Sequence, residues 1–285
     1  IIRRGQHIDT VKVSDVTEED LAAMMVGREV SFAVDKQPKT PGEKTLEIQN
    51  LVVEDSRGIK VVDNLSLECR KGEILGIAGV DGNGQTELIE AITGLRKVHS
   101  GAIKVNGQDI VNLAPGTIRN DHKVSHIPED RQKRGLVFEF DVAENMILTS
   151  YFKSQFSKWF TLLKSNIYQN AEKLIQLFDI RPQNALIPAR ALSGGNQQKM
   201  IIAREVSSEP EMLIASQPTR GLDVGAIEYV HEALVAQRDQ GRAVLLISFE
   251  LDEVINVSDR IAVIYEGKIV GIVDAHSADE KQIGL

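Results

Sequence analysis

Short apolar runs separated by glycine-containing loops recur along most of this chain. Some of these runs alternate apolar and polar positions, as strands of an antiparallel sheet do. Others are uninterrupted, which is typical of strands that are buried on both faces. The alternating runs are residues 46–53 and 64–69, the uninterrupted runs are 73–78, 212–215 and 243–248, and a hairpin turning at Gly267 is predicted from 260–265 and 268–273.

Helical periodicity fills the segments between these runs. Residues 86–93 predict a helix closed by Gly94. Between about 138 and 190 we expect strands to stop and helices to take over. The apolar positions on one helical face there are Ala171, Leu174, Ile175 and Phe178. This order of elements predicts an α/β domain with a mostly parallel core sheet, an antiparallel β edge and a helical segment.

The first 45 residues have a different pattern. Residues 1–6 predict a strand and a turn with no Met before them, so we expect the chain to be a piece of a longer protein. Residues 17–20 (TEED) have the form of a helix N-terminal cap. Residues 31–45 contain two Pro, a Gly and several charged residues, and this composition predicts a linker.

Composition narrows the possible functions. The 285 residues are 42% apolar and 26% charged, which is enough for one large α/β domain plus an appendage. The net charge of −8 argues against a nucleic-acid-binding surface. The single cysteine, Cys69, excludes a disulfide framework and fits a reducing compartment. No apolar run approaches the roughly 18–20 residues of a membrane span, so we expect any membrane association to go through a partner protein.

A glycine-rich loop follows the apolar run at 73–78. Residues 79–86 (GVDGNGQT) have the spacing of the phosphate-binding pattern G-x-x-x-x-G-K-[ST], with Gln85 in place of the Lys. A neutral hydrogen bond contributes about 1 kcal/mol against roughly 1.5–3 for a charge-assisted one. We therefore expect a weakened phosphate site, with the Thr86 hydroxyl as a weak Mg²⁺ ligand. The predicted phosphate-binding residues are Gly79, Gly82, Asn83, Gly84, Gln85 and Thr86.

Residues 192–195 (LSGG) open a further helix, whose N-terminus favours an anion. The run resembles the signature motif of ATP-binding-cassette (ABC) ATPases. In that family the motif contacts the γ-phosphate of an ATP held by a different cassette, so it is a half-site. The resemblance also matches Asp223 to the D-loop Asp, which crosses to the partner site. The residues it implies for the partner's ATP are Leu192, Ser193, Gly194, Gly195, Gln197 and Asp223.

The sequence departs from the family at the positions that carry hydrolysis. Residues 212–219 (MLIASQPT) resemble the family's hhhhDEPT strand, with Ser216 replacing the Asp that organises Mg²⁺ and Gln217 replacing the Glu that polarises water. Phe249 stands where the family has a His that contacts the γ-phosphate, and Glu129 takes the place of the Q-loop Gln. We therefore expect no catalytic residue in this chain's own site, whose degenerate positions include Gln85.

By this resemblance the chain is identified as the second, C-terminal cassette of a tandem sugar- or nucleoside-type importer ATPase, with a P-loop NTPase fold. Residues 24–30 (MMVGREV) resemble the end of a first copy. The implied domains are the tail of a preceding cassette at 1–30, a linker at 31–45, a cassette at 46–275 with a helical subdomain at about 138–190, and a C-terminal tail at 276–285. The alternative for residues 1–30 is that they are a simple N-terminal decoration of the cassette.

The same resemblance implies an asymmetric pair of sites. The first cassette of the same chain would hold the working ATP, while this cassette binds ATP and Mg²⁺ weakly or not at all. Two transmembrane permease subunits and, indirectly, a substrate-binding lipoprotein are the implied partners. Nucleic acid is not among them. The implied location is peripheral, on the cytoplasmic face of a bacterial cell membrane.

Two other functions stay open. Residues 215–228 and 248–273 resemble the nucleoside branch that depends on a basic membrane lipoprotein, and a simple-sugar importer of the ribose or galactose type is the alternative. A non-hydrolytic, ATP-binding regulatory clamp is the alternative of another class. We expect surface or structural roles for all six histidines and a solvated loop for the charge-rich stretch 129–134. The histidines are His7, His99, His122, His126, His231 and His276.

Overall fold

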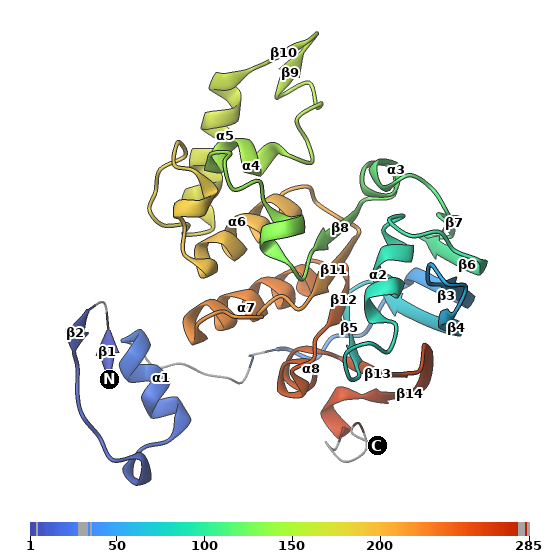
Figure 1. The fold of residues 1–285 in the computed structure, drawn as a ribbon, viewed down its shortest axis with the longest axis horizontal. Coiled ribbons are helices and arrows are strands. Elements are labelled where there is room, and N and C mark those ends of the chain that lie inside the picture. The colour runs from blue at the N-terminus through green and yellow to red at the C-terminus, as the bar shows by residue number, and fades with distance from the viewer. Residues whose placement is uncertain (4, 28–33, 35, 279–282, 284–285) are drawn as a thin grey trace.

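The computed structural model describes residues 1–3, 5–27, 34, 36–278 and 283 (Figure 1). The strands in this part of the chain are β1 (Ile2–Arg3), β2 (Gln6–His7), β3 (Lys44–Glu54), β4 (Lys60–Arg70), β5 (Glu73–Ala78), β6 (Ser100–Val105), β7 (Gln108–Asp109), β8 (Val124–Ile127), β9 (Ser157–Lys158), β10 (Thr161–Leu162), β11 (Met212–Ser216), β12 (Ala243–Ile247), β13 (Arg260–Tyr265) and β14 (Lys268–Asp274). The α-helices are α1 (Glu18–Val26), α2 (Gln85–Ile92), α3 (Pro115–Asn120), α4 (Val142–Ile147), α5 (Lys164–Leu177), α6 (Gly194–Val206), α7 (Val224–Asp239) and α8 (Leu251–Val257). Short helical turns are η1 (Val13–Asp15), η2 (Arg131–Gly135), η3 (Ala189–Ala191) and η4 (Ala275–Ser277).

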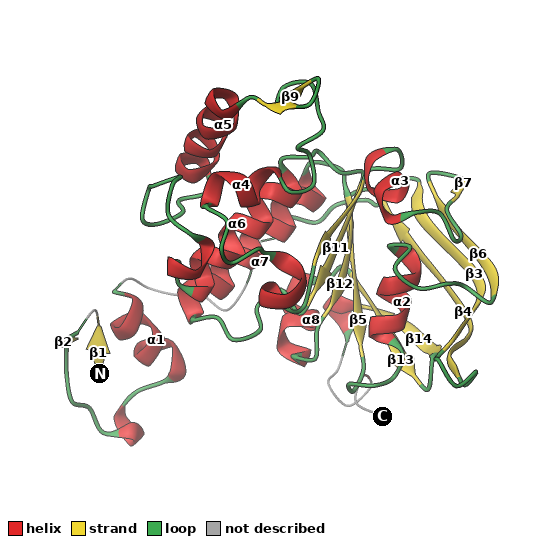
Figure 2. Ribbon diagram, turned by 45° about the horizontal axis from the view of Figure 1, so that its top comes forward, coloured by secondary structure: helices red, strands yellow, loops and turns green. Residues whose placement is uncertain are grey.

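Two sheets form the body of the fold. The six-stranded sheet has the order β14-β13-β5-β12-β11-β8, in which only β14 pairs antiparallel with its neighbour. The four-stranded sheet, of order β4-β3-β6-β7, is antiparallel throughout. Figure 2 shows α2 between the two sheets and α6 to α8 on the opposite face of the six-stranded sheet. The predicted α/β fold with a mostly parallel core sheet and antiparallel strands is confirmed.

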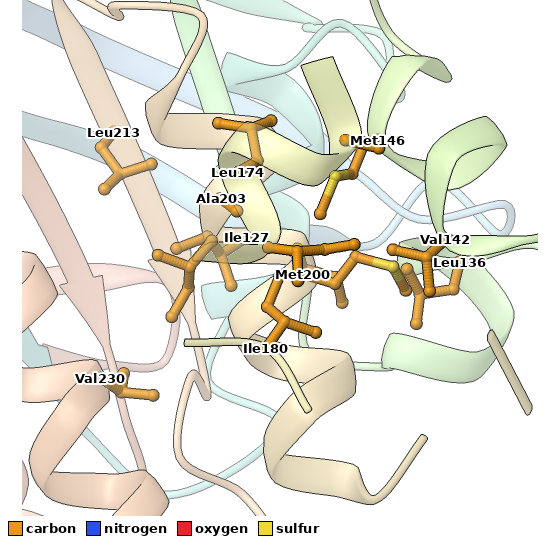
Figure 3. Packing of buried hydrophobic residues seen from close by; sticks show 14 of the residues in the cluster. Ile127, Leu136, Val142, Met146, Leu174, Ile180, Met200, Ala203, Leu213 and Val230 are labelled. Carbon is orange, nitrogen blue, oxygen red and sulfur yellow. The ribbon is translucent and has the colours of Figure 1, made fainter. Parts of the chain in front are cut away.

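The central strands supply two cores at once. Along β11, Met212 and Ile214 pack into the core between the sheets, whereas Leu213 and Ala215 pack into the core beneath the helices. This division follows from the period of two in a strand, and it explains why the run is apolar at every position. Figure 3 shows the helical side of this packing, where Met200 of α6 lies near Ile127 and Ile180. Each fully buried Leu, Ile or Met contributes about 1.5–3 kcal/mol to folding.

Parallel pairing gathers the ends of the buried strands at one edge of the sheet. β12 lies between β5 and β11 and is parallel to both. The segments that follow these three strands, beginning at Gly79, Gln217 and Ser248, therefore emerge side by side. Loops at the carboxyl ends of parallel strands are the usual position of a ligand site in such sheets.

The strand and hairpin predictions between 46 and 273 are confirmed, with β3 and β4 longer than their alternating cores. One expectation in this range is wrong. The segment 138–190 is not free of strands, because β9 and β10 form a small antiparallel hairpin there. Two-residue strands are too short to produce a readable alternation, so the pattern could not reveal them. The remainder of that segment includes α4, η3 and α5.

The N-terminal residues form a small unit of β1, β2, η1 and α1 (lower left in Figure 1). The predicted cap of α1 is confirmed, since the Thr17 hydroxyl accepts from the Asp20 N–H at 3.2 Å and the Asp20 carboxylate accepts from the Thr17 N–H at 2.9 Å. Part of the predicted linker is fixed on the main domain, because Lys36 pairs with Asp259 at 3.2 Å. Residues 28–33 and 35, and most of 279–285, lie outside the described residues, so the predictions for 24–30 and for the C-terminal tail are only partly covered.

Candidate nucleotide site and signature face

The glycine-rich loop connects β5 to α2 and has a tightly fixed backbone. Gly84 has φ +99°, and a Cβ atom there would lie 2.4 Å from the Val61 carbonyl oxygen. Both facts require glycine, because the left-handed conformation and the close approach leave no room for a side chain. The hairpin turn after β13 holds the loop from the other side, since the N–H of Glu266 donates to Asn83 Oδ1 at 2.7 Å.

Gln85 is folded into this loop instead of extending from it. Its side chain is 3% exposed, and its Nε2 donates to the Val80 carbonyl at 3.0 Å. Its Oε1 accepts from the backbone N–H of Asn83 at 3.1 Å. A phosphate loop binds its anion through backbone N–H groups such as this one. The glutamine therefore occupies one of the donors that a phosphate would need, a contact that a Lys could not make because it has no acceptor.

Ser216 ends β11 and Gln217 follows it, and both residues are buried. Gln217 has φ +45°, and its Oε1 accepts from the N–H of Phe249 at 3.3 Å. The Gln217 Nε2 atom is buried and has no hydrogen-bond partner among the described residues. The structure thus brings Gln217 and Phe249 into contact, although they are 32 positions apart. An amide at this position has no useful basicity at neutral pH, and Phe249 offers only its backbone.

A cavity of about 570 Å³ opens beside the loop, within the usual size range of ligand sites. It brings together Thr86 from α2, Ser216 from β11 and Glu129 from the segment after β8. Glu129 forms an ion pair with Arg220, which also lines the cavity. Its other lining residues include Glu90, His126, Asp130, Arg131, Lys133 and Arg134. The stretch 129–134, expected to be a solvated loop, therefore also forms a cavity wall, because η2 turns it back over α2.

Arg131 is the functional candidate that sequence reasoning missed. Its Nη1 donates to the Arg220 carbonyl at 2.7 Å, and a Cβ placed on Gly194 would lie 3.7 Å from its Nη2. Arg131 thus lies between the cavity and the start of α6, two places far apart in the sequence. Burial lowers the pKa of this guanidinium, which stays cationic under any ordinary condition. The charge run was visible in the sequence, but its folding against α6 was not.

His126 lines the same cavity from β8. Burial lowers the pKa of its imidazole to about 4, so the ring is neutral at pH 7. Its Nε2 is buried without a hydrogen-bond partner among the described residues. The expected structural role fits the burial of this ring.

The LSGG run begins α6 as predicted. Ser193 is the N-cap residue, its hydroxyl accepting from the Asn196 side chain at 2.9 Å. A hydroxyl also carries a proton to donate, so this contact leaves Ser193 a free donor. Asp223 lies next to the motif, since a Cβ on Gly195 would be 3.9 Å from its carboxylate. We call the exposed surface of Ser193, Gly194, Gly195 and Asp223 the signature face.

Two residues predicted to serve a partner's ATP do not reach this face. Gln197 is 7% exposed, and its amide donates to the carbonyls of Ala189 and Leu192 at 3.3 and 3.2 Å. Leu192 is 5% exposed and belongs to the core beneath the helices. These side chains hold the turn that presents Ser193, and their part in binding a partner's ATP stays a prediction.

The donor set in the cavity fits Mg²⁺ poorly. Thr86 and Ser216 offer neutral hydroxyls, whereas Mg²⁺ in phosphate sites is usually held by a carboxylate. Glu129 is engaged with Arg220. Nowhere in the described ranges do three or more His, Cys, Asp or Glu side chains group as a metal site would require. A phosphate group fits better, because Thr86 and several basic residues line the cavity.

Comparison with known proteins agrees with this geometry. Residues 62–220 match the ABC transporter family. The guanosine import ATP-binding protein NupO of Bacillus subtilis is 53% identical over 285 residues, covering 100% of this chain and 56% of that protein. The glucose import ATP-binding protein TsgD13 of Haloferax volcanii is 46% identical over 287 residues, covering 100% and 52%. The chain thus spans about half the length of the curated relatives it matches.

The fold has a counterpart among solved structures. A nucleotide-free ATP-binding cassette from an ABC transporter superposes with a TM-score of 0.69 at 22% identity, covering 85% of this chain and 94% of that chain. No helix within the described ranges is long and apolar enough to cross a lipid bilayer. The match over 62–220 includes the glycine-rich loop, the LSGG run and the ends of β5 and β11. The chain belongs to the ABC transporter family, and its fold is that of an ATP-binding cassette.

Proposed function

We propose that this chain is the C-terminal cassette of a tandem ATP-binding subunit that powers nucleoside import. Its own nucleotide site does not turn over, and its signature face completes the working ATP site of the first cassette. The extent of the relatives supports a tandem protein, because the chain aligns with 56% of the guanosine import protein. The limits at 1–30, 31–45, 46–275 and 276–285 belong to this proposal.

One observation carries the proposal, namely the contrast between this chain's own phosphate loop and its signature face. The loop that would hold this chain's own phosphate is closed on itself by Gln85, while the signature face is exposed and correctly capped. A domain that had merely lost its function would have no reason to keep only the half-site used by a partner. This asymmetry supports donation of the signature face to another cassette.

The chemistry of the signature face follows from its position at a helix N-terminus. The first N–H groups of α6 have no intrahelical acceptor, and the helix dipole favours negative charge there. With the Ser193 hydroxyl as a further donor, the face is suited to the γ-phosphate of an ATP bound elsewhere. Asp223 caps α7 beside it, its carboxylate accepting from the Ala226 N–H at 3.0 Å. Arg131 adds a positive charge behind Gly194.

The chain's own site lacks what hydrolysis requires. ATP supplies the reactive phosphate and Mg²⁺ neutralises its charge, but Gln217 provides no base and Ser216 no carboxylate. What remains is a weak phosphate-binding loop with the Thr86 hydroxyl. The proposed site residues are therefore of two kinds: Gly79, Gly82, Asn83, Gly84, Gln85, Thr86 and Glu129 around a weak nucleotide site, and Ser193, Gly194, Gly195 and Asp223 for the partner's ATP.

The proposed partners follow from import. Two transmembrane permease subunits would hold the protein at the cytoplasmic face of the membrane, the helical segment at 138–190 facing them, and a substrate-binding lipoprotein would act with them indirectly. Nucleosides are favoured because the identity to the guanosine import protein, 53%, exceeds that to the glucose import protein, 46%. Simple-sugar import is the second candidate, supported by the latter likeness. A regulatory ATP-binding clamp is the remaining one.

The decisive experiment compares the two halves within the longer protein that contains this chain, reconstituted with its permease subunits. Ser193→Arg places a long cation in the space for the partner's γ-phosphate, so we expect ATPase activity and uptake to be abolished. Gln85→Ala changes a site that does not turn over, so we expect most of both activities to persist. Equal effects from the two variants would refute the asymmetric pair, and absence of ATPase activity from the unmodified protein would indicate the clamp.

The substrate is tested by transport competition in the same preparation. Labelled guanosine uptake should be reduced by excess unlabelled adenosine or uridine and should be insensitive to excess ribose or glucose. Uptake of labelled ribose or glucose with no uptake of guanosine would establish the sugar alternative and overturn the nucleoside assignment.

A further inference from the structure

The hairpin of β9 and β10 presents the most exposed aromatic residues of the described chain. Trp159 and Phe160 form its two-residue tip and are 88% and 103% exposed. Figure 1 shows this hairpin projecting beyond α5 at the top of the molecule, away from both sheets. Nothing in nucleotide binding accounts for it, because the cavity beside the glycine-rich loop is lined by other segments.

The tip is exposed although its base is firmly held. Phe156, just before β9, is 4% exposed and belongs to the core beneath the helices. The N–H of Leu163 donates to the Phe156 carbonyl at 2.8 Å, and the Asn166 amide donates to the Gln155 carbonyl at 2.9 Å. The fold therefore fixes this hairpin in a protruding position.

Turn formation does not explain the tryptophan. Trp159 has φ +58°, a left-handed conformation that Gly and Asn adopt readily and a bulky residue adopts at a cost. Two further aromatic residues, Tyr151 and Phe152, lie in the loop before β9, are 54% and 50% exposed, and contact each other edge to face. Four exposed aromatic rings in ten residues form an amphipathic surface rather than isolated exceptions.

The charge around these rings has one sign. Lys153, Lys158 and Lys164 are exposed, and none of the three pairs with a carboxylate in the part of the chain that the structure describes. No Asp or Glu occurs between Glu144 and Glu172, although the whole chain has 41 acidic residues and a net charge of −8. An acid-free aromatic segment with three cations is complementary to an anionic, amphipathic surface.

We propose that this aromatic–lysine hairpin, residues 151–164, inserts into the headgroup region of an anionic lipid bilayer. Tryptophan is enriched at membrane interfaces because its amphipathic ring suits the boundary between headgroups and acyl chains. Each Lys near an anionic membrane surface adds about 1 kcal/mol of attraction, which is about a fivefold increase in binding. A hairpin tip is too small for a stable dimer interface, which needs about 800 Å² from each partner. Lipid contact adds to the proposed import function and does not depend on nucleotide turnover.

Trp159 is the only tryptophan of the chain, so its own fluorescence reports the contact. The chain is mixed with vesicles of equal parts phosphatidylglycerol and phosphatidylcholine, or of phosphatidylcholine alone. We expect a blue shift of the emission with the anionic vesicles, quenching by lipids brominated near the headgroup, and loss of both in high salt. Emission unchanged by anionic vesicles would overturn the proposal, as would an equal shift with phosphatidylcholine alone, which would leave no role for the lysines.

Variants distinguish binding through the hairpin from nonspecific adsorption of the protein to vesicles. Vesicle cosedimentation is the measurement. Trp159→Asn with Phe160→Ser suits the left-handed turn, so the fold should persist, as circular dichroism would show. We expect this variant to bind at least about tenfold more weakly. The matched control is Leu177→Ser with Leu186→Ser, which removes two apolar side chains of the same helical region, 69% and 65% exposed, without touching the hairpin.

The control variant should cosediment like the unmodified chain. Lys158→Gln should reduce binding about fivefold on anionic vesicles. Equal losses in the hairpin and control variants would refute a specific hairpin contact. Normal binding of the hairpin variant would overturn the proposed lipid contact of these aromatic residues. Either result leaves the nucleotide proposal standing, since ATPase activity and uptake test that separately.

Discussion

The glycine-rich loop and the signature face are both helix N-termini built from glycine, yet the structure treats them in opposite ways. At the loop before α2, the Asn83 N–H is taken by Gln85 Oε1, and the Gln85 amide is taken by Val80. At the start of α6, Ser193 is exposed and keeps a free hydroxyl proton. The difference teaches that one side chain carrying an acceptor can occupy a backbone N–H of a glycine-rich loop.

Catalysis gives the largest expected contrast. We predict that the 285-residue chain hydrolyses MgATP no faster than a preparation lacking it, because Gln217 cannot act as a base and Ser216 is not a carboxylate. A missing general base alone costs about 10²–10⁴-fold in rate. Phosphate release is the measurement. Gln217→Glu should not restore turnover, since Mg²⁺ organisation stays absent; ordinary cassette rates in either protein would contradict the comparison.

The second largest expected contrast is in stability, between substitutions at Gly84 and at Gly194. Gly84→Ala places a Cβ 2.4 Å from a carbonyl oxygen at φ +99°, so we expect a loss of about 3 kcal/mol in the free energy of unfolding. Gly194→Ala is the matched control, because the nearest atom to its Cβ would be 3.7 Å away, and it should change stability by less than about 0.5 kcal/mol. Urea unfolding measures both, and similar losses would show that the two backbones are equally constrained.

Reopening the closed loop gives a smaller effect. Gln85→Lys removes the acceptor that holds the Asn83 N–H and supplies a cation, so MgATP should bind about tenfold more tightly. Calorimetry of the isolated chain measures this. Gln240→Lys adds the same charge at an exposed position after α7 and should leave affinity unchanged. Unaltered binding by Gln85→Lys would mean that the internal hydrogen bond does not limit the site.

The smallest expected effect is on the stability of the protein at acidic pH. An unfolded His has a pKa of about 6.5, whereas burial lowers the pKa of His126 to about 4. Between these values the unfolded chain binds a proton that the folded chain does not, so stability falls as pH falls through this window. His126→Asn should therefore lose less stability between pH 7 and pH 5 than the unmodified chain, as urea midpoints would show. His276→Asn, at an exposed position, should lose as much stability between pH 7 and pH 5 as the unmodified chain. Equal acid sensitivity of the unmodified chain and both variants would exclude His126 as the cause.

The candidate site could be predicted from sequence only in part. The spacing of the glycine-rich loop and the LSGG run placed Gln85 and Ser193 at helix N-termini, because these patterns depend on residues close together in the chain. The burial of Gln197 against the Ala189 and Leu192 carbonyls was not foreseen, and Arg131 was not singled out. Both depend on which side chain meets which backbone across distant segments, and a linear pattern carries no information about that.

The sequence by itself determined the buried strands, the hairpin at Gly267 and the cap at Thr17. Each of these rests on local periodicity or on a side chain's own chemistry. Tertiary structure decided the strand order that places β12 between β5 and β11, the closure of the loop by Gln85, and the exposure of Trp159 at a projecting turn. These depend on packing between segments far apart in the chain, where burial and hydrogen-bond geometry select one arrangement among many that the same local pattern allows.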